Sequence, residues 1–468
     1  MNHPLMVILL LLAAAVLGVW VIYAFDGTGD SGDSIVHYQF ARFAYKHPMN
    51  FLDSWAKPVF VLLTAPFAQF GFVGMKSFNL LLSVMTSFLL FRVLRKMGAS
   101  MAWMTIPFLF AAPLFFTLIF SGLTEYLFAF FLVLALYLSM NRRFWVAGLL
   151  ISFLPFVRSE GLLILPVFML YFVLRRQGYA LLWLLTGHLV YALAGAIFKG
   201  DPFWMFTQNA YVAFSNEYGS GDLWHFFRQM PYVIGVPLAV LLVASMVLFA
   251  VLLFRKDFRC RPFFTERVVL VALPFLVYFA AHVVFWKFGL FHSMGLKRVL
   301  IAVVPLMILP VVEGLSMLYD WMSRKHIRWA GLILMLLFHA VVVFPFTSGP
   351  AAINPERELA REPLQREALA VCNQLKEKVV LGSFSRIYCS AQNIEFFLDM
   401  DPFDKERCLK VKEYQRGSGK SLVIWDCCAA QCEDGVAVET LLANENLEVL
   451  FKSPGVSQQY CYYVFTEK

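Results

Sequence analysis

Long apolar runs separated by short polar turns occupy the first three quarters of the chain. A helix needs about 20 apolar residues to cross the hydrocarbon core of a bilayer. Runs of this kind lie near residues 4–25, 72–94, 102–120, 125–140, 144–157, 161–174, 179–198, 232–254, 268–288, 299–320 and 329–346. The pattern predicts about eleven membrane-spanning helices, whereas the shorter run 58–70 predicts an interfacial or re-entrant helix.

The polar turns between these runs are unequal in charge. Fifteen Lys and Arg residues lie in five short turns, and these turns alternate with others that carry few. The fifteen are Arg92, Arg95, Lys96, Arg142, Arg143, Arg175, Arg176, Arg255, Lys256, Arg259, Arg261, Arg267, Arg324, Lys325 and Arg328. Because short basic loops face the cytoplasm, the N-terminus is predicted to be cytoplasmic and residues 347–468 extracytoplasmic. The long loops 26–57 and 199–231 then face outward too.

The composition changes after the last apolar run. Residues 347–363 are rich in Pro and charge, which predicts a linker. Helical patterns at 364–377 and 437–443 then alternate with strand patterns at 379–382, 422–426, 447–452 and 460–466. The expected fold is mainly α: a polytopic transmembrane helical bundle over 1–346, followed by a small extracytoplasmic α/β domain over 364–468.

The cysteines gather in this outer domain. Cys260 lies in a predicted cytoplasmic turn, and the other seven are Cys372, Cys389, Cys408, Cys427, Cys428, Cys432 and Cys461. Outer compartments permit disulfides, and an odd number leaves at least one Cys outside an intramolecular pair. A metal site at Cys427, Cys428 and Cys432 is the alternative, but repeated CxxC pairs are missing and no His occurs in 347–468. Disulfides of undetermined pairing are therefore predicted.

The composition supports a membrane protein. The chain has 468 residues, of which 15% are charged and 60% hydrophobic, whereas a soluble domain carries about 25% charged residues. An aromatic content of 17% also excludes a disordered chain. The formal net charge of +8 is concentrated in short turns, so it reflects topology, and no nucleic-acid partner is predicted.

The first candidate for chemistry is the loop that follows the first helix. Asp26, Asp30 and Asp33 lie within eight residues, and His37 follows Asp33 at i, i+4 spacing. In the structural alternative, Asp30 caps a helix over 31–46 and Asp33 lies in its first turn. Capping explains one acid but not three acids beside a histidine. Since a carboxylate can accept a proton from a hydroxyl as a general base, Asp33 and Asp30 are the predicted catalytic residues.

Two further outer turns carry charged side chains. Glu125 begins one predicted span, and Arg158 and Glu160 join two others. Capping is an equally good interpretation, with Thr124 and Ser159 as N-caps and the acids at positive helix ends. Arg158 is harder to explain in this way, because basic residues are disfavoured on the outer side.

A third charged cluster lies in the short outer loop 287–298. Lys297 and Arg298 start a helix, where a cation opposes the helix dipole, and they depart from the positive-inside tendency. Together with His292 they would suit a lipid phosphate, and contact with bulk anionic head groups is the alternative. Within the spans, the ionisable residues interpreted as hydrogen-bonded packing residues are His188, His282, Glu313 and His339.

The outer motifs occur in a characteristic order. They are Asp30-Ser-Gly-Asp33, His37-Tyr-Gln-Phe-Ala-Arg42, His47-Pro48, Phe51-Leu-Asp53-Ser-Trp55-Ala-Lys57-Pro58, Ser121-Gly-Leu-Thr-Glu125, Leu154-Pro-Phe-Val-Arg158-Ser-Glu160-Gly161 and Gly295-Leu-Lys-Arg298. In this order and sidedness the chain resembles the GT-C superfamily of polytopic glycosyltransferases that use polyprenyl-phosphate sugars. Within the superfamily it is most similar to bacterial relatives of the protein and GPI-anchor mannosyltransferases and to the aminoarabinose transferase.

The resemblance implies an inverting, mannosyltransferase-like enzyme. It would transfer mannose, or another hexose or pentose, from a polyprenyl-phosphate donor to a glycan, lipid or protein acceptor on the outer face. Asp33 best matches the family's loop acid and Asp30 is second, although family members often have adjacent acids there. The implied donor-phosphate ligands are Arg298, Lys297, His292 and Arg158, and the weaker substrate contacts are His37, Lys57, Glu125 and Glu160. Divalent metal use varies within the superfamily, and no metal or other cofactor is predicted here.

Two other functions remain open at this stage. A transporter or flippase for a lipid-linked or anionic substrate would need polar residues along a path at the bilayer midplane, where Glu313 is the only acid. A non-enzymatic assembly or receptor protein is the other alternative, but it would not explain the acidic loop or Arg298. The predicted location is the bacterial inner membrane, with membrane lipids as further partners.

Overall fold

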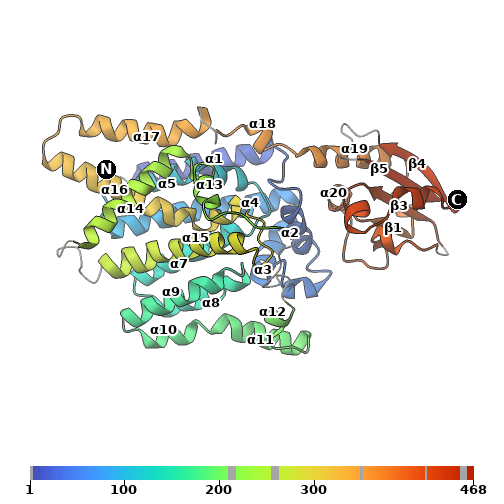
Figure 1. Cartoon of the computed structure of the whole chain (residues 1–468), viewed down its shortest axis with the longest axis horizontal. Helices are drawn as coiled ribbons and strands as arrows, with labels where there is room; N and C mark the ends of the chain where they lie inside the picture. Colours follow the sequence, from blue (N-terminus) through green and yellow to red (C-terminus); the bar gives the residue numbers. More distant parts are fainter. Residues whose placement is uncertain (1–3, 209–217, 255–262, 348–351, 417–418, 454–460) are drawn as a thin grey trace.

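The computed structural model describes residues 4–208, 218–254, 263–347, 352–416, 419–453 and 461–468. It shows a bundle of helices that run roughly in one direction, with a small α/β domain at one end (Figure 1). Among the predicted cytoplasmic residues, Arg255, Lys256, Arg259, Cys260 and Arg261 lie outside the described part of the chain.

The apolar helices match the predicted runs. Within the described residues, seven segments are long and apolar enough to span a membrane: α1 (Pro4–Ala24), α4 (Phe72–Lys96), α10–α11 (Gly178–Phe198), α14 (Val236–Phe254), η5–α15 (Phe264–Phe288), η6–α16 (Lys297–Arg324) and α17 (Ala330–Thr347). Shorter apolar helices occupy the other predicted spans: η2–α5 (Ala102–Ala111), α7 (Glu125–Met140), α8–η3 (Phe144–Phe156) and α9 (Gly161–Leu174). The prediction of a polytopic helical membrane protein is therefore confirmed.

Several spans are built from two consecutive helices. Their parts are η2 (Ala102–Met104) and α5 (Thr105–Ala111), α8 (Phe144–Ser152) and η3 (Leu154–Phe156), α10 (Gly178–Trp183) and α11 (Thr186–Phe198), η5 (Phe263–Ala272) and α15 (Leu273–Phe288), and η6 (Lys297–Val303) and α16 (Val304–Arg324). The short helix α6 (Pro113–Leu118) continues the span that begins with α5.

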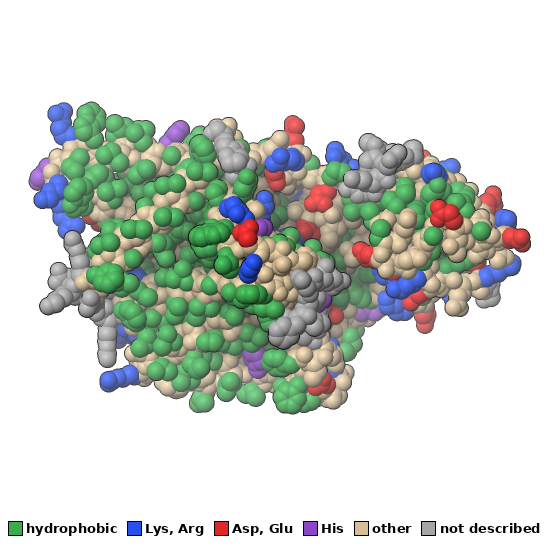
Figure 2. All heavy atoms as spheres, in the orientation of Figure 1, with side chains coloured by type: hydrophobic (Ala, Val, Ile, Leu, Met, Phe, Trp, Pro, Cys, Tyr) green, Lys and Arg blue, Asp and Glu red, His purple; other side chains and the backbone are tan. Residues whose placement is uncertain are grey.

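The bundle has a protein-enclosed centre and a lipid-facing rim. The apolar window of η6–α16 is 94% buried, whereas those of α1, α10–α11, α14 and α17 are each 22% buried. A helix that is apolar all round fits either a core or a lipid environment. Hydrophobic side chains cover much of the visible side of the bundle, and Lys and Arg side chains lie at the end opposite the α/β domain (Figure 2). Which end faces outward stays a prediction.

The loop between α1 and α4 is largely helical. It contains α2 (Asp33–Arg42), η1 (Pro48–Leu52) and α3 (Pro58–Ala68), and the last matches the short helix predicted at 58–70. The helix predicted over 31–46 is shorter than expected and ends at Arg42. His47 precedes Pro48, and a residue before proline disfavours the helical conformation, so the chain leaves the helix before this point.

The second long loop also differs from its prediction. It contains α12 (Trp204–Thr207) and α13 (His225–Ile234), so the apolar run predicted at 232–254 is divided between α13 and α14. Gly235 separates them with φ of 84°, a conformation that only glycine adopts without strain. The break lets α13 pack against α6 and η6 instead of continuing the span.

The α/β domain has a five-stranded mixed sheet in the order β2-β1-β3-β5-β4. Its strands are β1 (Arg386–Cys389), β2 (Cys408–Leu409), β3 (Ser421–Asp426), β4 (Leu447–Ser453) and β5 (Tyr462–Glu467). Strand β1 runs parallel to β2 and β3, and β5 runs antiparallel to β3 and β4. Side chains of α19 (Pro363–Lys378) and α20 (Gln392–Phe397) pack on one face, and α21 (Val438–Leu442) packs on the other. The remaining short elements are α18 (Pro355–Glu358), η7 (Leu381–Ser383), η8 (Val411–Glu413) and η9 (Ala429–Glu433).

The strand predicted at 379–382 is wrong. This segment leads into the turn η7, and Val380 is 76% exposed. The strand lies a few residues later, at β1, where Ile387, Tyr388 and Cys389 are buried between neighbouring strands. A four-residue apolar run does not reveal by itself which segment will pair with a distant strand.

Among the described cysteines of this domain, Cys372, Cys389, Cys408, Cys432 and Cys461 are free thiols. Cys427 and Cys461 nevertheless lie side by side beyond the ends of β3 and β5. The Cys461 N–H donates to Cys427 Sγ at 3.0 Å, and the Cys427 N–H donates to the Cys461 carbonyl at 3.1 Å. Disulfide formation in the domain stays a prediction, and this pair is placed for it.

The α/β domain packs directly on the loop between α1 and α4. The Phe396 ring lies 5.6 Å from the rings of both Tyr38 and Phe72, and Asp399 pairs with Arg42 at 3.2 Å. The predicted linker 347–363 is also partly packed, because Leu359 joins the bundle core and its carbonyl accepts a hydrogen bond from the Gly27 N–H. The first outer loop is thus held between the bundle and the α/β domain.

Candidate active site

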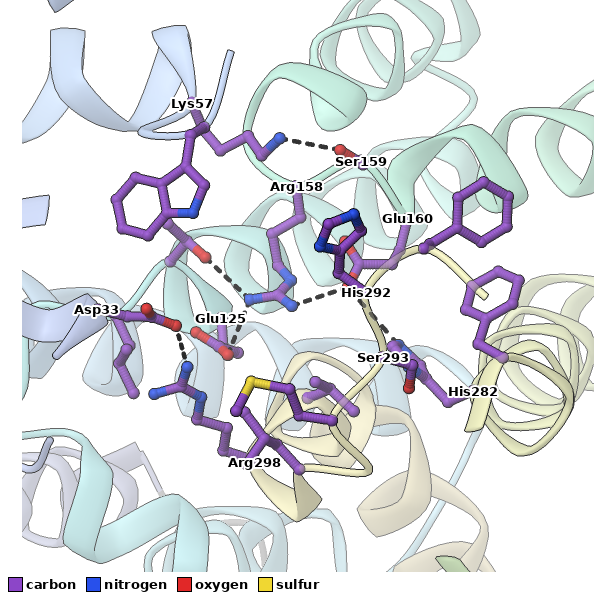
Figure 3. A pocket seen from close by; sticks show the side chains of 18 of the residues that line it. Asp33, Lys57, Glu125, Arg158, Ser159, Glu160, His282, His292, Ser293 and Arg298 are labelled. Atoms are coloured by element: carbon purple, nitrogen blue, oxygen red, sulfur yellow. Dashed lines mark hydrogen bonds and ion pairs between the residues drawn. The ribbon is translucent and has the colours of Figure 1, made fainter. Parts of the chain in front are cut away.

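A cavity of about 310 Å³ lies where the loop between α1 and α4 meets the starts of α7, α9 and η6 (Figure 3). It is lined by eight of the ten residues predicted as site residues: Asp33, His37, Lys57, Glu125, Arg158, Glu160, His292 and Arg298. Apolar side chains such as Phe226, Phe285 and Leu296 complete its wall. The structure therefore gathers residues that lie up to 265 positions apart in the sequence.

Arg298 joins the two predicted catalytic acids. Its Nη1 pairs with Asp30 Oδ2 and its Nη2 pairs with Asp33 Oδ2, so one guanidinium binds two carboxylates. The side chain of Arg298 is 14% exposed, that of Asp30 is 27% exposed and that of Asp33 is 45% exposed. Asp33 therefore presents the more accessible carboxylate, and Arg298 fixes its orientation.

Asp30 also serves the start of α2. Its Oδ1 accepts hydrogen bonds from the Gly32 N–H at 2.8 Å and the Ser34 N–H at 3.4 Å. Gly32, and not Asp30 as in the capping alternative, is the N-cap residue of α2, but Asp30 still supports the helix start, and its two oxygens are divided between these N–H groups and Arg298. Asp33 is the first residue of the helix, where a carboxylate lies next to the positive end of the helix dipole.

Arg158 organises a second cluster. Its Nη1 lies 2.8 Å from Glu125 Oε1 and 3.0 Å from Thr124 Oγ1, and its Nη2 lies 2.7 Å from Glu160 Oε1. Glu125 is almost fully buried, with 2% of its side chain exposed. Both acids therefore serve an ion-pair cluster at the cavity, which the capping interpretation did not require (Figure 3).

The two predicted helix caps, Thr124 and Ser159, do not act as caps. Thr124 accepts a hydrogen bond from Arg158, and Ser159 Oγ accepts one from Lys57 Nζ at 2.9 Å. Neither the helix that begins at Glu125 nor the one that begins at Gly161 has a side-chain N-cap bond. Both hydroxyls instead position cations that line the cavity.

Lys57 is buried at the cavity wall, with 5% of the residue exposed. Its Nζ also donates to the Ser54 carbonyl at 2.7 Å. Its φ is 69°, an uncommon backbone conformation for a side-chain-bearing residue, which points to a positional demand on this lysine. Burial lowers the pKa of the Lys57 ammonium to about 8. A poorly hydrated cation of this kind is well suited to bind an anion.

His37 is a neutral, stacked side chain. Its ring lies parallel to the Trp55 ring, with 4.7 Å between centroids, and meets Phe60 edge-on at 5.3 Å. Burial, reinforced by the nearby Arg298 guanidinium, lowers the pKa of His37 to about 3. Its buried Nδ1 has no hydrogen-bond partner among the described residues. His37 can therefore offer a hydrogen bond to a bound substrate without adding charge.

Two histidines border the far side of the cavity. His292 lines it from a loop in which both Phe291 and His292 have φ of 54°. His282, which the sequence indicated only as a packing residue, also lines the cavity, with Nε2 3.6 Å from Glu160 Oε1. Its position near the outer end of an apolar span is the signal that could have identified it, because ionisable groups there are commonly functional.

Lys297 is the one predicted phosphate ligand that does not line the first cavity. It lines a second cavity of about 250 Å³, together with Gly29, Leu118 and Glu362, and its Nζ lies 5.3 Å from the centre of the Tyr232 ring. Arg298 borders both cavities. For metal binding, no group of three or more His, Cys, Asp or Glu in the described residues is arranged as a ligand set.

Comparison with known proteins identifies the fold. No protein-family model and no curated protein sequence matches the chain. Two crystal structures of ArnT from Cupriavidus metallidurans do, one bound to undecaprenyl phosphate (12% identity, TM-score 0.66) and one in the apo state (13% identity, TM-score 0.64). Each alignment covers 98% of this chain and 97% of the other. The chain therefore has the same fold as these two ArnT structures along nearly its whole length, in agreement with the GT-C-like architecture that the motif order predicted.

Proposed function

We propose that this protein is an inverting GT-C-type glycosyltransferase that moves a sugar from a polyprenyl-phosphate donor to an acceptor hydroxyl at the outer membrane face. The observation that carries the proposal is the Asp30–Arg298–Asp33 bridge at the cavity, because it couples an accessible carboxylate to a cation at the membrane surface. The ArnT structure with undecaprenyl phosphate, which has the same fold, supports a polyprenyl-phosphate partner.

In the proposed reaction, Asp33 accepts the proton of the acceptor hydroxyl. The hydroxyl oxygen attacks the anomeric carbon, and the bond from that carbon to the phosphate oxygen breaks. The electron pair leaves with the polyprenyl phosphate, so the configuration at the anomeric carbon is inverted. A positioned general base typically contributes a factor of about 10²–10⁴ to such a step.

The cavity also offers cations for the phosphate that departs. Arg298 lies beside the proposed base, and Lys57 and Arg158 project from neighbouring turns (Figure 3). Charge on the phosphate grows as the glycosidic bond breaks, and donors fixed in advance stabilise this charge most effectively. His292 lines the same cavity and completes this set, whereas Lys297 would act from the second cavity.

The remaining lining acids orient these cations. Glu125 and Glu160 hold Arg158 from two sides, and His37 lies next to the proposed base on α2. We further propose a bacterial inner-membrane location, with the N-terminus in the cytoplasm and the α/β domain outside, because the basic turns lie at the end away from that domain (Figure 2).

The test is sugar transfer by the purified protein. The donors are radiolabelled polyprenyl-phosphate sugars that include mannose, other hexoses and pentoses. With at least one of them, the radiolabel should leave the lipid and appear on an acceptor. Asp33→Asn is the matched control, since it keeps the size of the side chain. No transfer with any donor, in the presence of glycan, lipid and protein acceptors, would contradict the proposal.

A transporter is less well supported. The intramembrane acid Glu313 is bound by Arg267, with Nε 2.6 Å from Oε1, and Arg267 also donates to the Met97 carbonyl at 3.1 Å. Neither Glu313 nor Arg267 lines either cavity described above. The acid that a transport path would use is thus engaged in holding helices together.

A further inference from the structure

The acidic loop is anchored by a side chain from the α/β domain. Gln365, in the first turn of α19, is completely buried, and its Nε2 donates to Thr28 Oγ1 at 2.5 Å. Thr28 lies two residues before Asp30 and is 3% exposed. Gln365 thus binds the loop that carries the proposed base, although it lies 337 positions away from Thr28 in the sequence.

From Thr28 the hydrogen bonds continue into the site. Thr28 Oγ1 donates to the Asp30 carbonyl at 2.6 Å, and the Thr28 carbonyl accepts from Ser34 Oγ at 2.8 Å. Ser34 is the residue after Asp33, and its Oγ accepts from the Gly122 N–H at 2.6 Å. The segment that contains Asp30 and Asp33 is thus fixed on one side by the bundle and on the other by Gln365.

The amide of Gln365 is divided between two tasks. Its Oε1 accepts a hydrogen bond from the Glu362 N–H at 3.3 Å, which completes a capping box at the start of α19. An amide oxygen accepts and an amide nitrogen donates, so the capping bond leaves Nε2 for Thr28. A glutamate would fill the capping box equally well but has no hydrogen to donate when ionised. The choice of Gln at this position is explained by the contact with Thr28.

We propose that Gln365 is a positioning residue, through which the α/β domain holds the Asp30–Arg298–Asp33 bridge in its reactive geometry. The proposal rests on the glycosyltransferase function proposed above. Gln365 does not touch the cavity; it acts through Thr28 on the backbone of Asp30, whose carboxylate shares Arg298 with Asp33. A small displacement of a catalytic group lowers the rate of the chemical step more than it lowers binding.

The decisive variant is Gln365→Glu, which keeps the capping box and removes the donor to Thr28. A buried carboxylate costs stability, so kcat is measured per folded molecule. We expect the variant to insert, with this kcat for sugar transfer lowered by about 10- to 100-fold and KM for the donor within about twofold. Backbone amides of residues 28–36 should exchange hydrogen for deuterium about 10-fold faster, because the loop is released on one side.

Two further variants separate this role from general stability. Thr28→Val removes the other partner of the bond, and the double variant should be no slower than either single variant, since both break one chain of hydrogen bonds. Asp399→Asn is the matched control: it breaks the Arg42–Asp399 ion pair of the same interface, and asparagine tolerates the φ of 48° found there. This control should leave kcat and the exchange of residues 28–36 unchanged.

The outcomes distinguish the two proposals. If Asp33→Asn abolishes transfer while Gln365→Glu leaves kcat and exchange at wild-type values, the positioning role is wrong and the glycosyltransferase function stands. If the wild-type protein transfers no sugar, the proposed function fails, and the exchange measurement still decides whether Gln365 holds the loop. Faster exchange with unchanged kcat would overturn the catalytic consequence of the contact.

Discussion

Two arginine–carboxylate clusters at opposite ends of the bundle show how similar chemistry can serve different purposes. Near the basic end, Arg267 binds Glu313 and the carbonyl of Met97, the residue that follows α4. At the end near the α/β domain, Arg298 and Arg158 each bind two acids. Neither Arg267 nor Glu313 lines a cavity described above, so this pair joins helices. Arg298 and Arg158 both line the first cavity, where the proposed function would bring them to a substrate.

The largest effect is expected from Asp33→Asn. Loss of the proposed base should lower kcat for sugar transfer by about 10²–10⁴, whereas expression and melting temperature stay close to the wild type. Asp30→Asn is the comparison, because Asp30 divides its oxygens between the helix start and Arg298. Radiolabelled transfer assays measure both. Near-normal turnover of Asp33→Asn beside an inactive Asp30→Asn would reassign the base to Asp30.

A change to the Arg267–Glu313 pair should lower the stability of the protein and leave the chemical step unchanged. Glu313→Gln removes a carboxylate that is 9% exposed and paired with Arg267, and breaking a buried ion pair typically destabilises a fold by about 3–5 kcal/mol. We expect a lower melting temperature in detergent, with the rate of transfer per folded molecule unchanged. A thermal shift assay combined with activity at low temperature measures this. A large loss of kcat in the folded variant would mean that the two ends of the bundle are coupled.

Arg298→Ala should weaken donor binding by about 10- to 100-fold, because hydrogen bonds between charged groups are the strong ones. Arg298→Lys should recover only part of this affinity, since an ammonium is a point charge and does not bridge two carboxylates as a guanidinium does. Arg361→Ala is the matched control, because Arg361 pairs with Asp26 of the same loop, away from the cavity. Binding of a fluorescent polyprenyl phosphate reports all three. Equal affinities would reassign Arg298 to a purely structural role.

The pH dependence of binding should reveal Lys57. Its pKa is lowered to about 8, so the ammonium is present below this pH and is lost above it. If the cation binds the donor phosphate, affinity should fall by about 10-fold between pH 7 and pH 9. Lys57→Arg should remove this fall, because arginine stays charged throughout the range. A wild-type affinity that does not change over this interval contradicts the assignment.

The smallest effect on the protein is expected from reporter fusions. They test whether the end of the bundle near the α/β domain faces outward. Reporter fusions after Arg143 and Arg176 should give a cytoplasmic signal, and a fusion after Lys468 should give an extracytoplasmic one. Activity should not change in the last fusion. A cytoplasmic signal at Lys468 would place the cavity and both acids on the wrong side for an outer-face transfer.

The sequence determined the spans and the positions of the charged turns. Apolar runs of sufficient length must become helices in a bilayer, because unsatisfied backbone groups are too costly there, so α1, α4 and α14 follow from composition alone. The same logic marked Arg158 and Arg298 as unusual, since basic residues are disfavoured on the outer side, and the three acids beside His37 marked Asp33. The candidate residues could therefore be named before their partners were known.

Only the tertiary structure decided which charged groups meet. The sequence offered Asp30 and Asp33 as caps or bases and Arg298 as a phosphate ligand, and the fold joined them across 268 and 265 positions. It also left Lys297 out of the first cavity, although Arg298, the next residue in the chain, borders both cavities. Ion-pair partners depend on distances between helices, and these distances arise from packing along the whole bundle. Local sequence patterns do not determine these distances. For the same reason the contact of Gln365 with Thr28 could not be predicted from the sequence.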